Sequence, residues 1–169
     1  MQASLPLSVR LKAVVALAAV GACLSASLAV AQKADTPFAN LNGAWTGGGQ
    51  VRLEGGKTER ISCKAYYTPR DGGTGIGIAL RCASTTFSIN LRSMLTSQDG
   101  RVSGTWEEQT FNATGNVTGR ASPGSLSVSI NGGGITASMS VSFGGTTQQV
   151  SINTSGTALQ GVSISLSKG

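Results

Sequence analysis

The sequence predicts an all-β domain in which an antiparallel meander of about eight to ten strands closes into a barrel or a curved clam. Two observations predict this fold. Apolar residues alternate with Ser, Thr and Asn along most of the chain, which is the two-residue period of a half-buried strand. Glycine-rich breaks separate the alternating runs at the spacing of short hairpins. A two-sheet β-sandwich remains the alternative, because the same alternation also suits two packed sheets.

The N-terminal residues have the pattern of a secretory signal peptide. Arg10 and Lys12 precede the uncharged apolar run 13–22, and Ala29-Val30-Ala31 is a small-x-small cleavage pattern. The apolar run is too short to span a bilayer. We therefore expect residues 1–31 to be removed and the domain to be periplasmic or secreted.

Cys23 leaves a second interpretation of this region open. Val20-Gly21-Ala22-Cys23 loosely resembles the lipobox of bacterial lipoproteins, which would tether the domain to a membrane through lipid on Cys23. After cleavage we expect a lead-in over residues 32–42 and a single barrel-like domain over residues 43–169.

The individual strands follow from the alternating runs and from the turns between them. Leu126-Ser127-Val128-Ser129-Ile130 alternates strictly, and Gly132-Gly133-Gly134 ends this run as a hairpin turn would. Short sequential hairpins favour a meander in which neighbours in sequence are neighbours in the sheet. The expected strands are 43–53, 57–68, 76–84, 86–96, 101–109, 111–121, 125–131, 135–143, 147–154 and 160–167.

Cys63 and Cys82 are predicted to form a disulfide. A hairpin centred between Gly72 and Gly73 places the two cysteines directly opposite each other, on an apolar face that includes Tyr67. Opposed residues of an antiparallel pair lie within disulfide reach, and an exported protein meets an oxidising compartment. Two free thiols are the alternative. A zinc site is disfavoured because the chain has no histidine.

The residues that usually carry catalysis are scarce. The absence of histidine excludes Ser-His-Asp and Cys-His arrangements. Glu107 and Glu108 are adjacent on a strand and point to opposite faces, so they cannot act as a glycosidase pair. Glu108 shares a face with Trp106 and could contact a ligand inside the barrel, or could lie in water or pair with Arg81 or Arg92 near the strand end. We expect a non-enzymatic protein with no cofactor and no metal.

Charge is modest and unevenly distributed. The formal net charge is +6, but the basic residues are scattered, which excludes a nucleic-acid surface. Only Lys168 is charged in residues 121–169, where Ser, Thr, Asn and Gln form the predicted outer face. This face is either simply solvated or an interaction surface. Four Phe, two Trp and two Tyr are too few for the aromatic girdles of an outer-membrane barrel.

Two resemblances add to this interpretation. Residues 37–45, which end in Gly43-Ala44-Trp45, resemble the Gly-x-Trp opening of lipocalins and other calycin-type barrels. That resemblance implies that Trp45 plugs one barrel end and that apolar ligands bind inside. The domain is also similar to small exported proteins of alphaproteobacteria that combine Gly-x-Trp, a cysteine pair, Gly-x-Trp-Glu-Glu and a Ser-rich tail. The second resemblance implies export and fold, but no activity.

The predicted function is binding of a small apolar or amphipathic ligand within an exported barrel. The alternative is a cell-envelope interaction or inhibitor protein that acts through its Ser/Thr-rich surface. Ligand, partner and oligomeric state stay open. The candidate lining or plugging residues are Trp45, Tyr67, Phe87, Trp106 and Glu108.

Overall fold

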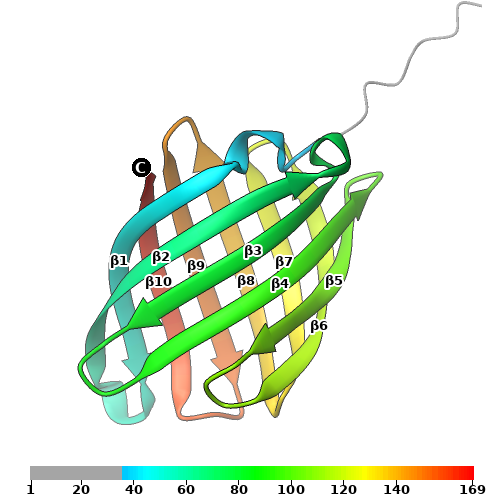
Figure 1. The fold of residues 1–169 in the computed structure, drawn as a ribbon. Coiled ribbons are helices and arrows are strands. Elements are labelled where there is room, and N and C mark those ends of the chain that lie inside the picture. Colours follow the sequence, from blue (N-terminus) through cyan, green and yellow to red (C-terminus); the bar gives the residue numbers. More distant parts are fainter. Residues whose placement is uncertain (1–35) are drawn as a thin grey trace, which may run out of the picture. The chain divides into compact units, whose positions relative to one another are not determined.

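The computed structural model describes residues 36–169 as a closed ten-stranded antiparallel barrel (Figure 1). Each strand is hydrogen-bonded to the next, and β1 pairs with β10 to close the sheet. The all-β meander barrel is confirmed, and the β-sandwich alternative is wrong. The signal peptide, its cleavage site and Cys23 lie outside the described residues.

The strand boundaries lie within about two residues of those expected, because the turn residues end each alternating run. The β3–β4 connection is the clearest difference. The sequence predicted that β4 starts at residue 86, but Ser84 N–H donates to the Phe87 carbonyl oxygen (2.9 Å) and delays pairing until Ser88. The strands are β1 (Gly43–Leu53), β2 (Thr58–Arg70), β3 (Gly75–Ala83), β4 (Ser88–Gln98), β5 (Arg101–Glu108), β6 (Ala113–Ser122), β7 (Ser125–Gly132), β8 (Ile135–Gly144), β9 (Thr147–Ser155) and β10 (Leu159–Lys168). Three short 3₁₀ turns are η1 (Ala39–Leu41), η2 (Glu54–Gly56) and η3 (Asp71–Gly73).

The two-residue period divides the strands into an inner and an outer face. In β7 the side chains of Leu126 and Val128 are buried, whereas Ser125, Ser127 and Ser129 are exposed. Nearly every strand follows this rule, and the inner faces together form one apolar interior. In β10 a register shift opposite Arg52 and Leu53 brings both Leu159 and Val162 to the inner side. The outer face of β7 to β10 is rich in hydroxyl and amide side chains, as expected.

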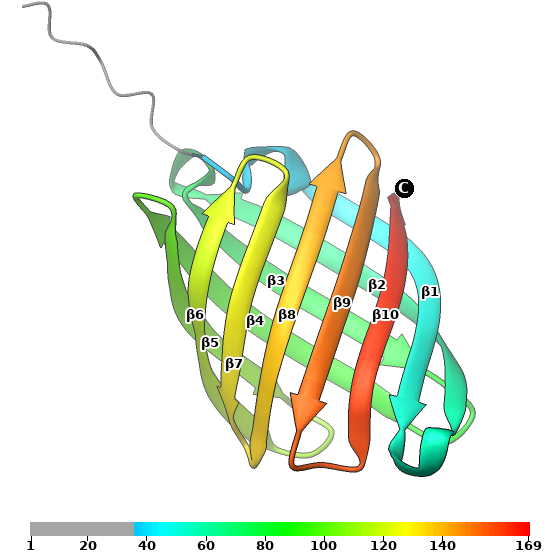
Figure 2. The same cartoon turned by 180° about the vertical axis from the view of Figure 1, so that it is seen from behind.

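Glycines inside the strands allow the sheet to bend at two corners. Strands β2 to β4 cross one side of the barrel at a steep slant, and β6 to β9 form the other side (Figures 1 and 2). A Cβ atom at Gly47 or Gly49 of β1, at Gly104 of β5, or at Gly115 or Gly119 of β6 would overlap a backbone oxygen of the adjacent strand. Glycine in a strand interior marks a tight bend of a barrel, and these five positions flank the two corners.

Residues 36–42 close one end of the barrel, although the sequence assigned them to a lead-in. Phe38 and Leu41 are buried, and Phe38 N–H donates to the Gly73 carbonyl oxygen (3.1 Å). The indole N–H of Trp45 donates to the Leu41 carbonyl oxygen (2.9 Å), which ties η1 to β1. This short segment is therefore part of the folded core. Within residues 36–169, no helix has the length and apolar character needed to cross a membrane.

Candidate functional site

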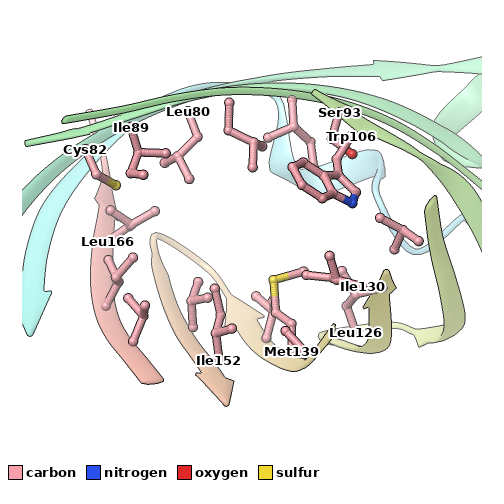
Figure 3. A pocket seen from close by; sticks show the side chains of 18 of the residues that line it. Leu80, Cys82, Ile89, Ser93, Trp106, Leu126, Ile130, Met139, Ile152 and Leu166 are labelled. Atoms are coloured by element: carbon pink, nitrogen blue, oxygen red, sulfur yellow. The ribbon is translucent and has the colours of Figure 1, made fainter. Parts of the chain in front are cut away.

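The interior of the barrel contains an apolar cavity of about 280 Å³ (Figure 3). All ten strands contribute side chains to its wall, and nearly all of them are aliphatic or aromatic. The polar side chains at the wall are few, namely those of Tyr67, Ser93, Glu108, Gln148 and Thr154. A concave apolar space with few polar groups is the usual form of a small-molecule site.

The interior is filled at one end and loosely packed at the other. Phe38, Trp45 and Ile76, near η1, are each about 1% exposed. Phe87 and Leu159, at the β3–β4 and β9–β10 turns, are only partly buried and line the cavity. These turns lie at the barrel end opposite η1 (Figure 1). Phe87 and Leu159 therefore form the partly buried wall of the cavity at the end away from η1.

Trp45 and Tyr67 pack together at the filled end. Their rings meet edge to face with centroids 6.1 Å apart, and the Lys168 ammonium lies 5.8 Å from the Trp45 ring centroid. Trp45 does not reach the cavity wall, so its position is that of an end plug. Tyr67 does reach the wall, where its hydroxyl donates to Gln148 Oε1 (2.8 Å).

The Tyr67–Gln148 pair satisfies two polar side chains inside an apolar wall. Burial raises the pKa of the Tyr67 phenol, and the hydrogen bond to Gln148 only partly opposes this effect. The phenol therefore stays neutral and remains a donor. Sequence reasoning missed Gln148, although the alternation of residues 147–155 places it on the inner face together with Val150 and Ile152.

Glu108 points inward, but its carboxylate is engaged by the backbone. Its Oε1 accepts the N–H of Asn90 (2.7 Å), and its Oε2 accepts the N–H of Phe111 (2.7 Å). Burial acts to raise the pKa of Glu108, yet these hydrogen bonds and those from Thr110 together hold the pKa below its ordinary value. Glu108 thus joins the start of β4 to the β5–β6 turn, and neither Arg81 nor Arg92 is its partner. Glu108 also lines the cavity, so its predicted contact with a ligand stays a prediction.

Trp106 forms part of the cavity wall between β4 and β6. Its side chain is 6% exposed and projects into the interior (Figure 3). Gly115 and Gly133 make room for the indole: a Cβ atom at Gly115 would stand 2.6 Å from Nε1, and one at Gly133 would stand 3.1 Å from Cη2. Nε1 has no hydrogen-bond partner. The sequence predicted a lining role for Trp106 but carried no signal for this unsatisfied donor.

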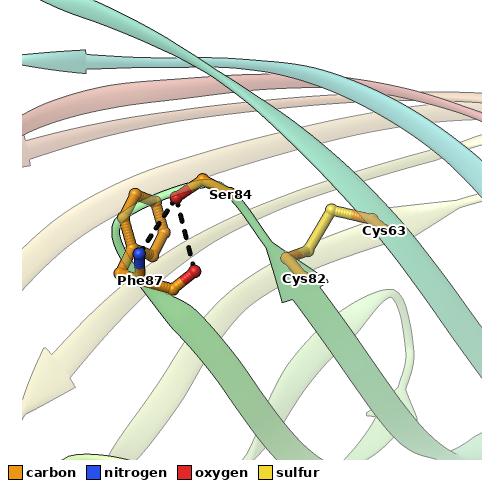
Figure 4. Close-up of a disulfide and its surroundings, with 4 residues drawn as sticks. All are labelled: Cys63, Cys82, Ser84 and Phe87. Atoms are coloured by element: carbon orange, nitrogen blue, oxygen red, sulfur yellow. Dashed lines mark hydrogen bonds between the residues drawn. A yellow bond between two sulfur atoms is a disulfide. The ribbon is translucent and has the colours of Figure 1, made fainter.

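The Cys63–Cys82 disulfide lies near the end of β3, just before the turn that carries Ser84 and Phe87 (Figure 4). The two cysteines are directly paired between β2 and β3, in the register that the sequence predicted, with Cα atoms 4.1 Å apart. Ser84 Oγ accepts the N–H of Phe87 (3.1 Å) and fixes the turn that carries the Phe87 ring.

Glu59 holds the same turn from β2, an arrangement that sequence reasoning missed. Its Oε1 accepts hydrogen bonds from Thr85 Oγ1 (3.1 Å) and from the N–H of Thr86 (3.1 Å). Hydrogen bonds from Ser84 and Thr86 lower the pKa of Glu59. No local pattern could have found these contacts, because the carboxylate and the turn are far apart in sequence and meet only through the β2–β3 pairing.

Comparison with known proteins identifies the fold. No protein-family model matches the chain, and no curated protein sequence matches it. Among solved structures, the S-type phycobiliprotein lyase CPES from Guillardia theta is similar, with a TM-score of 0.50 and 15% sequence identity. The similarity covers 76% of this chain and 88% of that chain. At this level of identity the match shows a similar overall fold and nothing further.

Proposed function

We propose that the barrel binds one small apolar or amphipathic molecule in its cavity and does not transform it. The observation that carries this proposal is the 280 Å³ space with its almost wholly apolar wall. Transfer of apolar surface from water into such a space is favourable by about 25 cal/mol per Å². The space equals roughly nine water molecules at ~30 Å³ each. Because a methylene group and a water molecule need similar room, a ligand with on the order of ten non-hydrogen atoms would fill it.

The likeness to a phycobiliprotein lyase supports the proposal only through the shared barrel. Barrels of about this strand number can enclose one small ligand. We also propose that the protein acts outside the cytoplasm. The signal-peptide pattern and the Cys63–Cys82 bridge support that placement, because disulfides persist in oxidising compartments. Mass analysis of the mature N-terminus would distinguish cleavage after Ala31 from lipid attachment at Cys23.

The binding proposal is tested by replacing a cavity-lining side chain with a larger one that occupies the ligand space. Leu80 lines the cavity, and the neighbouring Ala79 is exposed on the outer face of the same strand. We expect the neutral fluorophore naphthylamine to bind the native protein with a blue-shifted emission. Leu80→Trp should abolish that signal, because the larger ring occupies the ligand space, while the matched variant Ala79→Trp should retain it. Equal binding to both variants would place the fluorophore outside the cavity and contradict the proposal.

A second candidate function is interaction with an envelope protein through the outer face of β7 to β10. Its specific support is a row of serines that are directly paired across these four strands, Ser127, Ser140, Ser151 and Ser163. Native mass spectrometry of protein isolated from its own cells would separate the two candidates. A retained small molecule supports the cavity. A bound protein that is lost in Ser140→Lys, with the cavity still able to bind naphthylamine, supports the surface.

A further inference from the structure

Charged side chains are distributed unequally between the two sides of the barrel. Residues 121–169, which include β7 to β10, contain one charged residue, Lys168. Strands β2 to β4 lie on the other side, nearest the viewer in Figure 1, and the outward positions of these described strands hold five exposed cations and no carboxylate. These cations, called the basic face, are Arg60, Lys64, Arg70, Arg81 and Arg92.

Carboxylates of the same strands do not neutralise the basic face. Glu59 is the one acidic residue within β2 to β4, and its carboxylate accepts hydrogen bonds from the β3–β4 turn. Glu107 of β5 is paired with Arg92 at the border of the face. Lys64 and Arg81 are directly opposed across β2 and β3. Like charges directly opposite in a sheet are destabilising, so an anionic partner would relieve a repulsion that the folded chain contains.

Two exposed apolar side chains lie among these cations. Tyr66 and Met94, which are 56% and 45% exposed, are two of the three large exposed hydrophobic residues in the described part of the chain. Tyr66 is two residues from Lys64 on the same face of β2. Met94 and Arg70 converge over Gly77, where an added Cβ atom would stand 3.9 Å from Met94 Cε and 3.7 Å from Arg70 Nε. The basic face thus combines cations with side chains that suit a membrane–water interface.

The extent of the basic face favours a bilayer over a small soluble anion. Lys64 and Arg70 lie at the two ends of a stretch of β2 that spans roughly 20 Å at about 3.3 Å per residue. A single phosphate ion is held by donors that converge on one point. A bilayer of anionic lipids instead offers phosphates over a wide area, with apolar material directly beneath them. Cations spread over three strands, with Tyr66 and Met94 between them, match the second arrangement.

We propose that the basic face docks the barrel on an anionic phospholipid bilayer, with the neutral outer face of β7 to β10 turned to the aqueous side. In the docked protein, Lys64, Arg81 and Arg92 lie at the lipid phosphates, and Tyr66 enters the interface. The inference goes beyond the proposed function, because none of these side chains lines the apolar cavity. Docking would bring a barrel for apolar molecules to a surface at which such molecules are concentrated.

Sedimentation with vesicles measures docking directly. The native protein should bind vesicles of equal parts phosphatidylcholine and phosphatidylglycerol, less tightly as salt rises, and should not bind vesicles of phosphatidylcholine alone. Lys64→Ser/Arg81→Ser should weaken binding by about 25-fold, because each Lys or Arg near an anionic surface contributes about fivefold. Arg101→Ser/Arg120→Ser is the matched control. It removes the same charge from another directly opposed pair, in β5 and β6, and should weaken binding by less than about threefold at physiological ionic strength.

Tryptophan probes test the orientation of the docked protein. Tyr66→Trp places an indole within the basic face, and Ser140→Trp places one on the outer face of β8, where Ser140 is exposed. Brominated phosphatidylglycerol should quench the added fluorescence at position 66 and leave that at position 140 unchanged. The native protein, in which Trp45 and Trp106 are both buried, supplies the background signal.

The inference is overturned if the native protein does not bind the anionic vesicles, if it binds the neutral vesicles equally well, or if both double variants weaken binding equally. Quenching at position 140 as strong as at position 66 would also overturn it. Tighter binding to single-stranded DNA than to anionic vesicles would assign the face to nucleic acid instead. Circular dichroism shows whether each variant is folded, and naphthylamine binding in vesicle-free buffer tests the cavity separately. Docking that is lost in Lys64→Ser/Arg81→Ser while naphthylamine still binds supports the inference.

Discussion

Gly49 provides a direct test of how the barrel closes. It lies in β1 opposite Ile164 of β10, the pairing that joins the two ends of the sheet. A Cβ atom here would overlap the Ser163 carbonyl oxygen and stand 2.8 Å from Ile164 Cα. Both contacts are backbone atoms, so no side-chain rotation relieves them. Gly49→Ala must push β1 away from β10.

The expected cost follows from this geometry. Forcing extra atoms into a packed region typically costs 1–3 kcal/mol. Removing a glycine also restricts the unfolded chain, which returns about 0.4–1 kcal/mol. The weakened β1–β10 hydrogen bonds add to the cost, so we expect a net loss of about 2 kcal/mol in the free energy of unfolding. For a domain of this size, that loss lowers Tm by roughly 8 °C.

Gly144→Ala is the matched control. Gly144 also lies in a strand, but a Cβ atom there would have no heavy atom within 4 Å. Its substitution should leave stability unchanged or raise it slightly. Urea unfolding followed by tryptophan fluorescence measures both variants, and amide hydrogen exchange shows whether β1 and β10 open first. If Gly49→Ala is as stable as Gly144→Ala, the close approach of β1 and β10 does not require glycine at position 49. That result would refute the explanation that these glycines allow the sheet to bend at its corners.

Two further predictions concern the disulfide and the buried carboxylate. Replacing both Cys63 and Cys82 by Ala should lower the free energy of unfolding by about 3 kcal/mol, because the bridge closes a loop between cysteines 19 residues apart. If reduction of the native protein does not lower its urea midpoint, this prediction is contradicted. Glu108 has a pKa below its ordinary value, so its contribution to stability is present above about pH 4.3 and is lost as the pH falls through the lowered pKa. Glu108→Gln should therefore be less stable than the native protein at pH 7, and the difference should shrink in acid. Urea unfolding of both proteins between neutral and acid pH measures this difference in stability, and Glu107→Gln, a substitution of an exposed carboxylate, is the control. If the difference does not change with pH, titration of Glu108 does not contribute to the pH dependence of stability.

Most of the barrel wall could be predicted from the sequence because its signals are local. The alternation in residues 126–130 assigns each side chain to one face, and the turn at Gly72-Gly73 sets the β2–β3 register that pairs Cys63 with Cys82. The short hairpins imply a meander. Phe38 escaped prediction because residues 36–42 contain no periodic pattern, and their burial depends on the barrel end that they cover.

The candidate site could be predicted only in part. Tyr67, Phe87, Trp106 and Glu108 were expected to face the interior, and each of them lines the cavity. Their partners were beyond sequence reasoning. Glu108 meets Asn90 across the β4–β5 hairpin, and Tyr67 meets Gln148, which is 81 residues away in the chain.

The sequence by itself determined the all-β class, the hairpin order and the inner and outer faces, because each depends on residues that are neighbours in the chain. Only the tertiary structure decided that the inner faces leave an empty space and that one indole N–H has no acceptor. Alternation states which way a side chain points, but it contains no information on how far away the opposite wall stands. That distance is set by the closure of ten strands and by the bends at glycines such as Gly49 and Gly115, which are properties of the whole sheet.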